Sequence, residues 1–225
     1  EMARQVAHEI KNPLTPIRLG VQLLRRAHRD ARPDFGPMLE TTVDRVLAEI
    51  DRLDEIARAF SRYGTAPDRR APAEPVDAAA IARDVVALER LGQGGVAWEL
   101  EGADAPAPAM ARDGELREVL LNLLENARLA HARRVTLRVA SADGHVTLAV
   151  RDDGEGIAAA ALPRIFEPHF STRTSGSGLG LAISRRLVEA WGGSVRAESV
   201  RADEQPGAAA GTTVTLTLRR APGAD

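Results

Sequence analysis

The stretch Glu118-Val-Leu-Leu-Asn122-Leu-Leu-Glu125-Asn126-Ala127 decides the fold of the larger part of this 225-residue chain. Its leucines predict a helix over about residues 114–130, which places the two asparagines four apart on one face. Two segments of alternating polar and apolar residues follow, at 134–140 and 145–151. This mixture predicts an α/β sandwich, with helices on one face of a mostly antiparallel sheet. Further elements are expected as helices at about 77–91 and 179–191 and as strands at 96–100, 194–199 and 212–219.

The first 64 residues instead predict a hairpin of two helices, because apolar residues recur at alternating spacings of four and three. Residues 30–37 contain two prolines and a glycine and are expected to form the turn. Two helices alone bury little apolar surface, so we expect a homodimeric four-helix bundle. The alternative is a hairpin that packs on the rest of its own chain. The expected seam consists of Ala3, Ala7, Ile10, Leu14, Ile17, Val21 and Leu24, and of Leu39, Val43, Val46, Ile50, Leu53, Ala57 and Phe60.

Proline-rich stretches mark the expected boundaries. Residues 65–76 contain three prolines and are expected to link a hairpin domain at 1–64 to a second domain at 77–222. The Ala-Pro stretches at 103–109 and 206–210 are expected to be loops.

Composition excludes several classes of function. The formal net charge of -2 indicates no nucleic-acid partner and no electrostatic membrane contact. The chain has no cysteine, which excludes disulfides, thiolate catalysis and Cys-based metal sites. No apolar run approaches the ~20 residues that span a bilayer, and no signal peptide is visible. Lys11 is the only lysine and lies in no G-K-[ST] motif, so a P-loop nucleotide site is excluded.

The motif HEIKNP at residues 8–13 is a candidate phosphoryl-acceptor site. It lacks the second histidine of a zinc-protease H-E-x-x-H motif. His8 lies at the edge of the seam and shares a helix face with Asn12, while Glu9 can hold one imidazole nitrogen and raise the nucleophilicity of the other. An ordinary surface His-Glu pair is the alternative. Pro13 and Pro16 are expected to kink the helix just after His8.

Three further motifs indicate a nucleotide site. The amide oxygens of the leucine-rich helix suit Mg²⁺, and Asp152 in the run D-D-G-E-G-I at 152–157 could accept a hydrogen bond from an exocyclic amine. The run S-G-S-G-L-G-L at 175–181 opens a helix and suits phosphate groups. The stretch between residue 170 and this run is expected to be a mobile lid.

These motifs, in this order and behind a helical hairpin, resemble those of the sensor histidine kinases of two-component systems. The resemblance covers nearly the whole chain, and the run HEIKNPLTPIRL resembles the nitrogen-regulation (NtrY-type) branch. The matching positions are His8 for the H box, Asn122 and Asn126 for the N box, Asp152, Gly154 and Gly156 for the G1 box, Phe166 to Phe170 for the F box, and Gly176, Gly178 and Gly180 for the G2 box.

The resemblance implies the Bergerat (GHKL) ATPase fold, Mg·ATP as the phosphoryl donor and autophosphorylation of His8. It further implies a homodimer and transfer of the phosphoryl group to the receiver domain of a cognate response regulator, with possible regulator phosphatase activity. Asn126 is the implied Mg²⁺ ligand, Asp152 the adenine contact and Asn12 a group that helps hydrolyse the regulator's phosphoaspartate. The segment is expected to be the cytoplasmic part of a membrane-bound sensor. The other implied nucleotide contacts are Asn122, Ile157, Phe166, Phe170, Ser177, Leu179, Thr212 and the motif glycines.

The chain departs from the family pattern at three places. Leu129 stands where a polar or charged residue is usual, and its role could fall to Arg128 or Arg173; Val214 and His169 replace common aromatic residues. Two alternatives follow: a non-kinase ATPase of the same superfamily, which leaves His8 unexplained, and a degenerate kinase that acts as a scaffold or phosphatase.

Overall fold

The computed structural model of this chain describes residues 2–63, 72–92, 95–168, 170–172, 178–201, 203–204 and 209–223, without the side chains of 2–12, 51–52 and 54–63. The chain divides into two compact units, a helical hairpin and an α/β unit, and each is described by itself. None of the described helices combines the length and the apolarity that crossing a bilayer requires.

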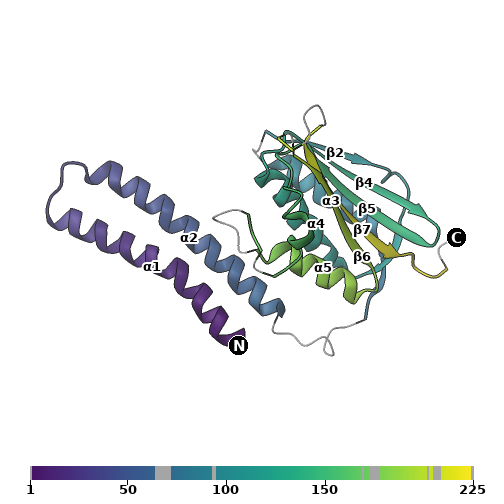
Figure 1. Cartoon of the computed structure of the whole chain (residues 1–225), viewed down its shortest axis with the longest axis horizontal. Helices are drawn as coiled ribbons and strands as arrows, with labels where there is room; N and C mark the ends of the chain where they lie inside the picture. Colours follow the sequence, from purple (N-terminus) through teal and green to yellow (C-terminus); the bar gives the residue numbers. More distant parts are fainter. Residues whose placement is uncertain are drawn as a thin grey trace. The chain divides into compact units, whose positions relative to one another are not determined.

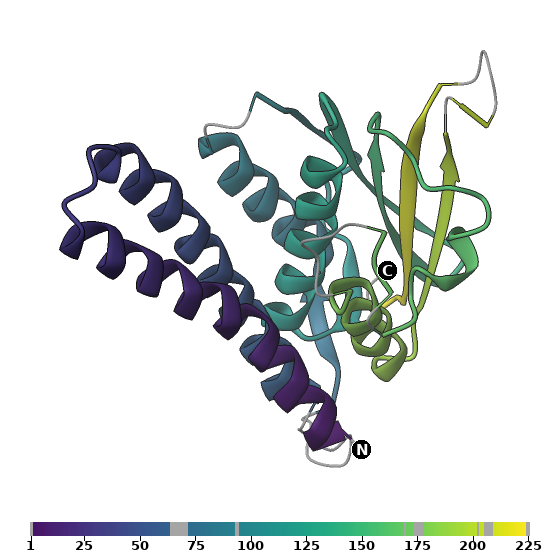
Figure 2. The same ribbon diagram turned by 60° about the vertical axis from the view of Figure 1, so that its left-hand side comes forward.

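The hairpin consists of α1 (Met2–Arg29) and α2 (Phe35–Tyr63), which pack side by side (Figures 1 and 2). Its turn is shorter than the predicted 30–37, because α2 already begins at Phe35. Pro37 therefore lies in the first turn of α2, where a helix needs no N–H from it. Helix α1 continues through both of its internal prolines, so they do not end it; the kink stays a prediction.

The expected apolar seam divides between two faces of the hairpin. Ile17, Leu24, Val46 and Leu53 are half-buried, as a seam requires. Other seam members, however, lie exposed in the single chain, by 37% to 53% of their surface. The hairpin thus has one row packed within itself and a neighbouring apolar row that it does not cover. The exposed seam members are Leu14, Val21, Leu39, Val43 and Ile50.

The α/β unit contains a five-stranded sheet in the order β2-β4-β5-β7-β6. Only β2 pairs in parallel, with β4, and the other pairs are antiparallel. Helices α3, α4 and α5 cover one face (Figure 1). The predicted sandwich is thereby confirmed. The strands are β2 (Ala97–Glu101), β4 (Arg134–Ala142), β5 (His145–Asp152), β6 (Ser194–Val200) and β7 (Gly211–Arg219), and the helices are α3 (Ala78–Leu91), α4 (Asp113–Leu129), α5 (Gly180–Ala190) and the 3-10 turn η2 (Leu162–Arg164).

A second, two-stranded sheet was not predicted. Strand β1 (Glu74–Asp77) takes in the end of the expected linker, and β3 (Pro108–Ala111) takes in the end of the stretch expected to be a loop at 103–109. Both strands contain a proline, which cannot donate to a ladder and lies only at edges, so neither gave a strand signal. Asp77 also accepts from the backbone N–H of Ala79 and Ala107, at 3.0 and 2.9 Å, and so caps α3.

Alternating residues of the central strands build the core between sheet and helices. Leu137 of β4, Leu148 of β5 and Leu216 of β7 are fully buried, as are Leu120 and Leu124 of α4, and α4 packs on β5. Each such side chain contributes about 1.5–3 kcal/mol when it leaves water. This packing places the end of β5, with its Asp152, beside the start of β7.

Candidate functional site

The carboxylate of Asp152 is the anchored group at the end of β5. Its Oδ1 accepts hydrogen bonds from the backbone N–H of Gly154 at 2.9 Å and of Thr212 at 3.2 Å. The side chain is only 9% exposed. A carboxylate has about four acceptor positions, so one held this way keeps its geometry and can accept a further donor. This arrangement suits recognition of an exocyclic amine.

The loop after Asp152 needs glycine at Gly156. Its φ is 75°, and a Cβ there would come within 2.1 Å of the carbonyl oxygen of Val200. The loop can therefore lie directly against the end of β6 only because this position lacks a side chain. The backbone N–H of the next residue, Ile157, donates to the hydroxyl of Ser199 at 2.7 Å.

Ser199 connects three segments and was missed in the sequence. Besides the contact with Ile157, its Oγ lies 3.0 Å from the carbonyl oxygen of Gly211 and 2.9 Å from the hydroxyl of Thr212. The available signal was its place in β6, where it alternates in phase with the half-buried Val195 and Ala197. A serine at such a position needs partners.

A second aspartate, Asp153, holds the start of β4. Its Oδ1 accepts from the backbone N–H of Arg134 at 2.8 Å and of Arg133 at 2.7 Å. The hydrogen bond from Arg134, followed by that from Arg133, lowers the pKa of Asp153 against the opposing effect of burial. The two adjacent carboxylates thus have separate tasks, and only Asp152 is in the interior.

Asn122 binds helix α5 instead of facing solvent. Its Nδ2 donates to the hydroxyl of Ser184 at 2.9 Å, and a Cβ on Gly180 would lie 2.3 Å from its Oδ1. The first asparagine of α4 therefore holds the turn at which α5 begins. Asn126 lies one helical turn further on the same face and is half-buried.

The residues present fit Mg²⁺ only if the ion shares its shell with phosphate and water. No group of three His, Cys, Asp or Glu side chains that could hold a metal occurs in the part of the chain that the structure describes. An amide oxygen such as that of Asn126 suits a hard cation that keeps most of its shell from phosphate and water.

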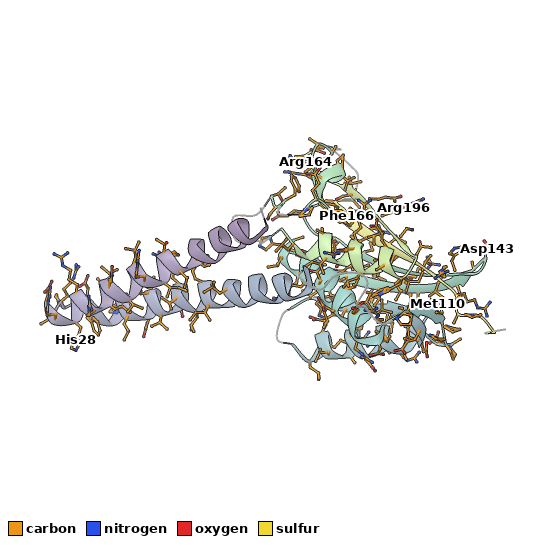
Figure 3. The ribbon with its side chains drawn as sticks, turned by 90° about the horizontal axis from the view of Figure 1, so that it is seen from below. His28, Met110, Asp143, Arg164, Phe166 and Arg196 are labelled. Atoms are coloured by element: carbon orange, nitrogen blue, oxygen red, sulfur yellow. The ribbon has the colours of Figure 1, made fainter. Side chains whose placement is uncertain are left out.

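The phenylalanines at the predicted F box each lie near an arginine. The guanidinium of Arg164 lies 4.5 Å from the ring centre of Phe170, and that of Arg185 lies 5.8 Å from that of Phe166. Figure 3 labels Arg164 and Phe166, one residue of each pair. Both rings are half-buried. The Arg185–Phe166 contact connects this segment to the surface of α5, whereas the Arg164–Phe170 contact lies within the segment.

Only the second half of the glycine-rich run is described. Gly178 has a φ of 66°, Leu179 is buried, and α5 begins at Gly180. Gly176 and Ser177 lie outside the described residues, as do His169 and Arg173.

Leu129 stands beyond Asn126 at the position where the family usually has a polar residue, and its side chain is exposed to solvent. Leu129 is 46% exposed. Arg128, proposed above as a substitute, forms a two-pronged pair with Glu125 at 2.8 and 2.6 Å. A paired arginine must break that contact before it can reach a phosphate. Val214, the other departure described, is buried.

The acceptor residues lie in α1. His8, Glu9 and Asn12 belong to a helical segment, and their side chains lie outside those described. Helical spacing places His8 and Asn12 on one face, and the roles of all three stay predictions.

Both parts of the chain match known protein families. Residues 112–222 match the family described as histidine kinase-, DNA gyrase B-, and HSP90-like ATPase, and residues 1–65 match the His Kinase A (phospho-acceptor) domain. The chain is 32% identical to the signal transduction histidine-protein kinase AtoS of Escherichia coli, over 97% of this chain and 34% of AtoS. It is 28% identical to the nitrogen regulation protein NtrY of Azorhizobium caulinodans, over 87% of this chain and 26% of NtrY.

A solved structure of a related protein has a similar fold. Full-length ShkA in complex with AMPPNP superposes with a TM-score of 0.61 and 27% identity, over 97% of this chain and 46% of ShkA. The chain spans about a third of the length of AtoS and a quarter of that of NtrY. Both domain types occur here, in the order of the family and on the fold that the motifs imply. The chain belongs to the sensor histidine kinases of two-component systems.

Proposed function

We propose that this chain is a kinase core that transfers the γ-phosphoryl group of ATP to His8, from which it passes to an aspartate of a response regulator. The observation that carries the nucleotide half is the anchored carboxylate of Asp152, held by two backbone donors. The match of residues 1–65 to a phospho-acceptor domain supports the other half. That match also counts against a non-kinase ATPase, which needs no such hairpin.

In the proposed complex, Asp152 accepts a hydrogen bond from the exocyclic amine of adenine. Gly156 lets the loop after Asp152 lie directly against the end of β6. The phosphates lie at the turn into α5, where the N–H groups of a helix N-terminus attract anions. Mg²⁺, held through Asn126, would neutralise part of the phosphate charge. The protein mainly positions groups in such a reaction, because phosphoryl transfer has a loose transition state.

The proposed chemical step is an in-line displacement. One imidazole nitrogen of His8 attacks the γ-phosphorus, the bond to the β–γ bridging oxygen breaks, and ADP leaves with the electron pair. Glu9 holds the proton on the other ring nitrogen and so raises the nucleophilicity of the attacking one. A carboxylate of the regulator then takes the phosphoryl group, which restores unmodified His8.

Labelling with γ-labelled ATP tests this step. We expect label that is stable in alkali and lost in acid, as a phosphoramidate is. His8→Gln should remove the label while leaving nucleotide binding intact, because His8 lies outside the α/β unit. Label that persists on His8→Gln would refute the assignment.

Glu9 and Asn12 are proposed to serve opposite directions of phosphate flow. Asn12 lies one turn beyond His8, where its amide could hold the water that hydrolyses a regulator phosphoaspartate. Asn12→Ala should keep much of the autophosphorylation and lose most of the regulator dephosphorylation, and Glu9→Ala should do the reverse. If Asn12 only caps backbone groups freed by Pro13 and Pro16, Asn12→Ala should lower both rates together.

We also propose a homodimer through the hairpin. The support is the apolar row that the single hairpin leaves exposed, which includes Val43 at 40% and Ile50 at 46%. Ile50→Asp with Leu53→Asp should give monomers, because unpaired charge in an interface is expensive. Light scattering that shows a monomer for the unmutated chain over a wide concentration range would count against this.

A further inference from the structure

Ser199 lies where three segments of the nucleotide site meet. Its hydroxyl contacts the N–H of Ile157 in the loop after β5, and the carbonyl of Gly211 and hydroxyl of Thr212 at the start of β7. These residues are separated by up to 55 positions in the chain. Thr212 in turn donates its N–H to Asp152. Thr212 is thus the single residue between Ser199 and the proposed adenine contact, Asp152.

The directions of these hydrogen bonds follow from the groups involved. A hydroxyl has one proton to donate and two lone pairs to accept. The N–H of Ile157 can only donate, and the carbonyl of Gly211 can only accept. All three contacts of Ser199 are satisfied together only when its proton points to Gly211 and Thr212 donates to Ser199. In that arrangement the Thr212 oxygen has no proton left and is an acceptor.

We propose that Ser199 is a positioning residue that makes Thr212 an acceptor, so that the site selects a 6-amino over a 6-oxo purine. This inference rests on the proposed nucleotide function. Thr212 is 8% exposed and Asp152 9% exposed, so few waters can compensate a mismatched partner. Two adjacent acceptors match the N–H groups of an adenine amine and repel the oxygen of hypoxanthine.

Removing the Ser199 hydroxyl should therefore change selectivity and not only affinity. In Ser199→Ala the proton of Thr212 loses its partner and can turn toward the base. The amine of ADP then faces a hydroxyl donor at Thr212 where it had faced an acceptor. The 6-oxo group of inosine diphosphate (IDP) instead gains a hydrogen-bond donor. We expect ADP affinity to fall about tenfold and the ratio of ADP to IDP affinity to fall by more than that factor.

The experiment measures ADP and IDP dissociation constants by titration calorimetry on the whole chain. Ser194→Ala is the matched control, because Ser194 lies exposed on the same strand. It should bind like the unmutated chain. Ser199→Thr keeps a hydroxyl and should keep most of the preference. Thr212→Val should lose the share of the preference that Thr212 supplies while Asp152 keeps the rest, and Ser199→Ala should add little to that loss in the double variant.

Each outcome decides between two roles. A merely structural role for Ser199 would lower ADP and IDP affinity by equal factors, and would overturn the inference. A preference that stays at the unmutated level in Thr212→Val would also overturn it, even if Ser199→Ala proved too unstable to measure. If the unmutated chain binds ADP and these variants keep its preference, only the Ser199 inference fails. If the unmutated chain binds neither nucleotide, the proposed function itself fails.

Discussion

Asp152→Asn should invert the base preference of the site while largely keeping the fold. An asparagine oxygen can still accept from the N–H groups of Gly154 and Thr212, which lie 2.9 and 3.2 Å from Oδ1. The loss of charge weakens each bond by about 0.5–1.5 kcal/mol. For a unit of this size, a total of about 1–3 kcal/mol lowers Tm by roughly 3–10 °C.

The effect on binding should be larger than the effect on stability. The new amide N–H₂ takes the place of the second carboxylate oxygen, so two donors oppose each other in a buried site. A lost charged hydrogen bond together with an unpaired donor costs about 3–4 kcal/mol, which is roughly a 10²–10³-fold loss of ADP affinity. IDP should lose much less, because its 6-oxo group can accept from the new N–H₂.

Competition between ADP and IDP, with thermal melting in parallel, is the assay. Asp153→Asn is the control, because Asp153 binds the backbone N–H groups of Arg133 and Arg134 and not the site. It should lower Tm and leave the base preference unchanged. Equal losses for ADP and IDP in Asp152→Asn would refute the reasoning, as would ADP affinity that stays at the unmutated level.

Three further predictions test the framework around the site. Ser184→Ala should raise the KM for ATP several-fold with a loss of about 1 kcal/mol in stability, because it removes the partner of Asn122 at 2.9 Å; an unchanged KM in a labelling assay would contradict this. Trp191→Phe should lower the free energy of unfolding by about 1–2 kcal/mol in urea titrations without changing ADP affinity, because it removes the indole N–H that donates to Glu115 at 3.0 Å. For Asp153→Ala, the folded-state pKa of the unmutated carboxyl is depressed, so its stabilisation is complete above the unfolded-state pKa and is lost as pH falls through the folded-state pKa. The difference in unfolding free energy between the two proteins should therefore be full at neutral pH and shrink in acid, and a difference independent of pH would rule out this origin.

The sequence predicted the α/β unit well because its elements have strong local signals. The helix around Asn122 and the strands on both sides of residue 143 have clear periodicity, and their limits agree with the structure to within one or two residues. The short strands β1 and β3 were missed because four residues with a proline carry no strand signal by themselves. They form through long-range pairing with each other, and Ala109 of β3 also bridges to Arg220.

The residues of the candidate site also differ in how far the sequence could predict their contacts. Asp152 and Gly156 stand in one short motif, so their relation was readable from the chain. The partnership of Asn122 with Ser184 spans 62 positions, and that of Ile157 with Ser199 spans 42. No local pattern announces a hydrogen bond between segments that only the sheet brings together. Asp153 lies between the motif positions Asp152 and Gly154, and no local pattern indicates that it holds the start of β4.

The register of the sheet nevertheless makes part of that pairing accessible in principle. Side chains alternate with a period of two along a strand, so Thr212 must lie on the same face of β7 as the buried Val214 and Leu216. Strand β6 pairs with β7 so that Ser199 lies opposite Thr212. A slip of one residue in β7 would turn the core leucines to solvent and would at the same time remove Thr212 from Asp152 and Ser199. The burial that stabilises the sheet therefore also sets the hydrogen bonds of the nucleotide site, so a core variant that loosens this register should lose ADP affinity before it unfolds.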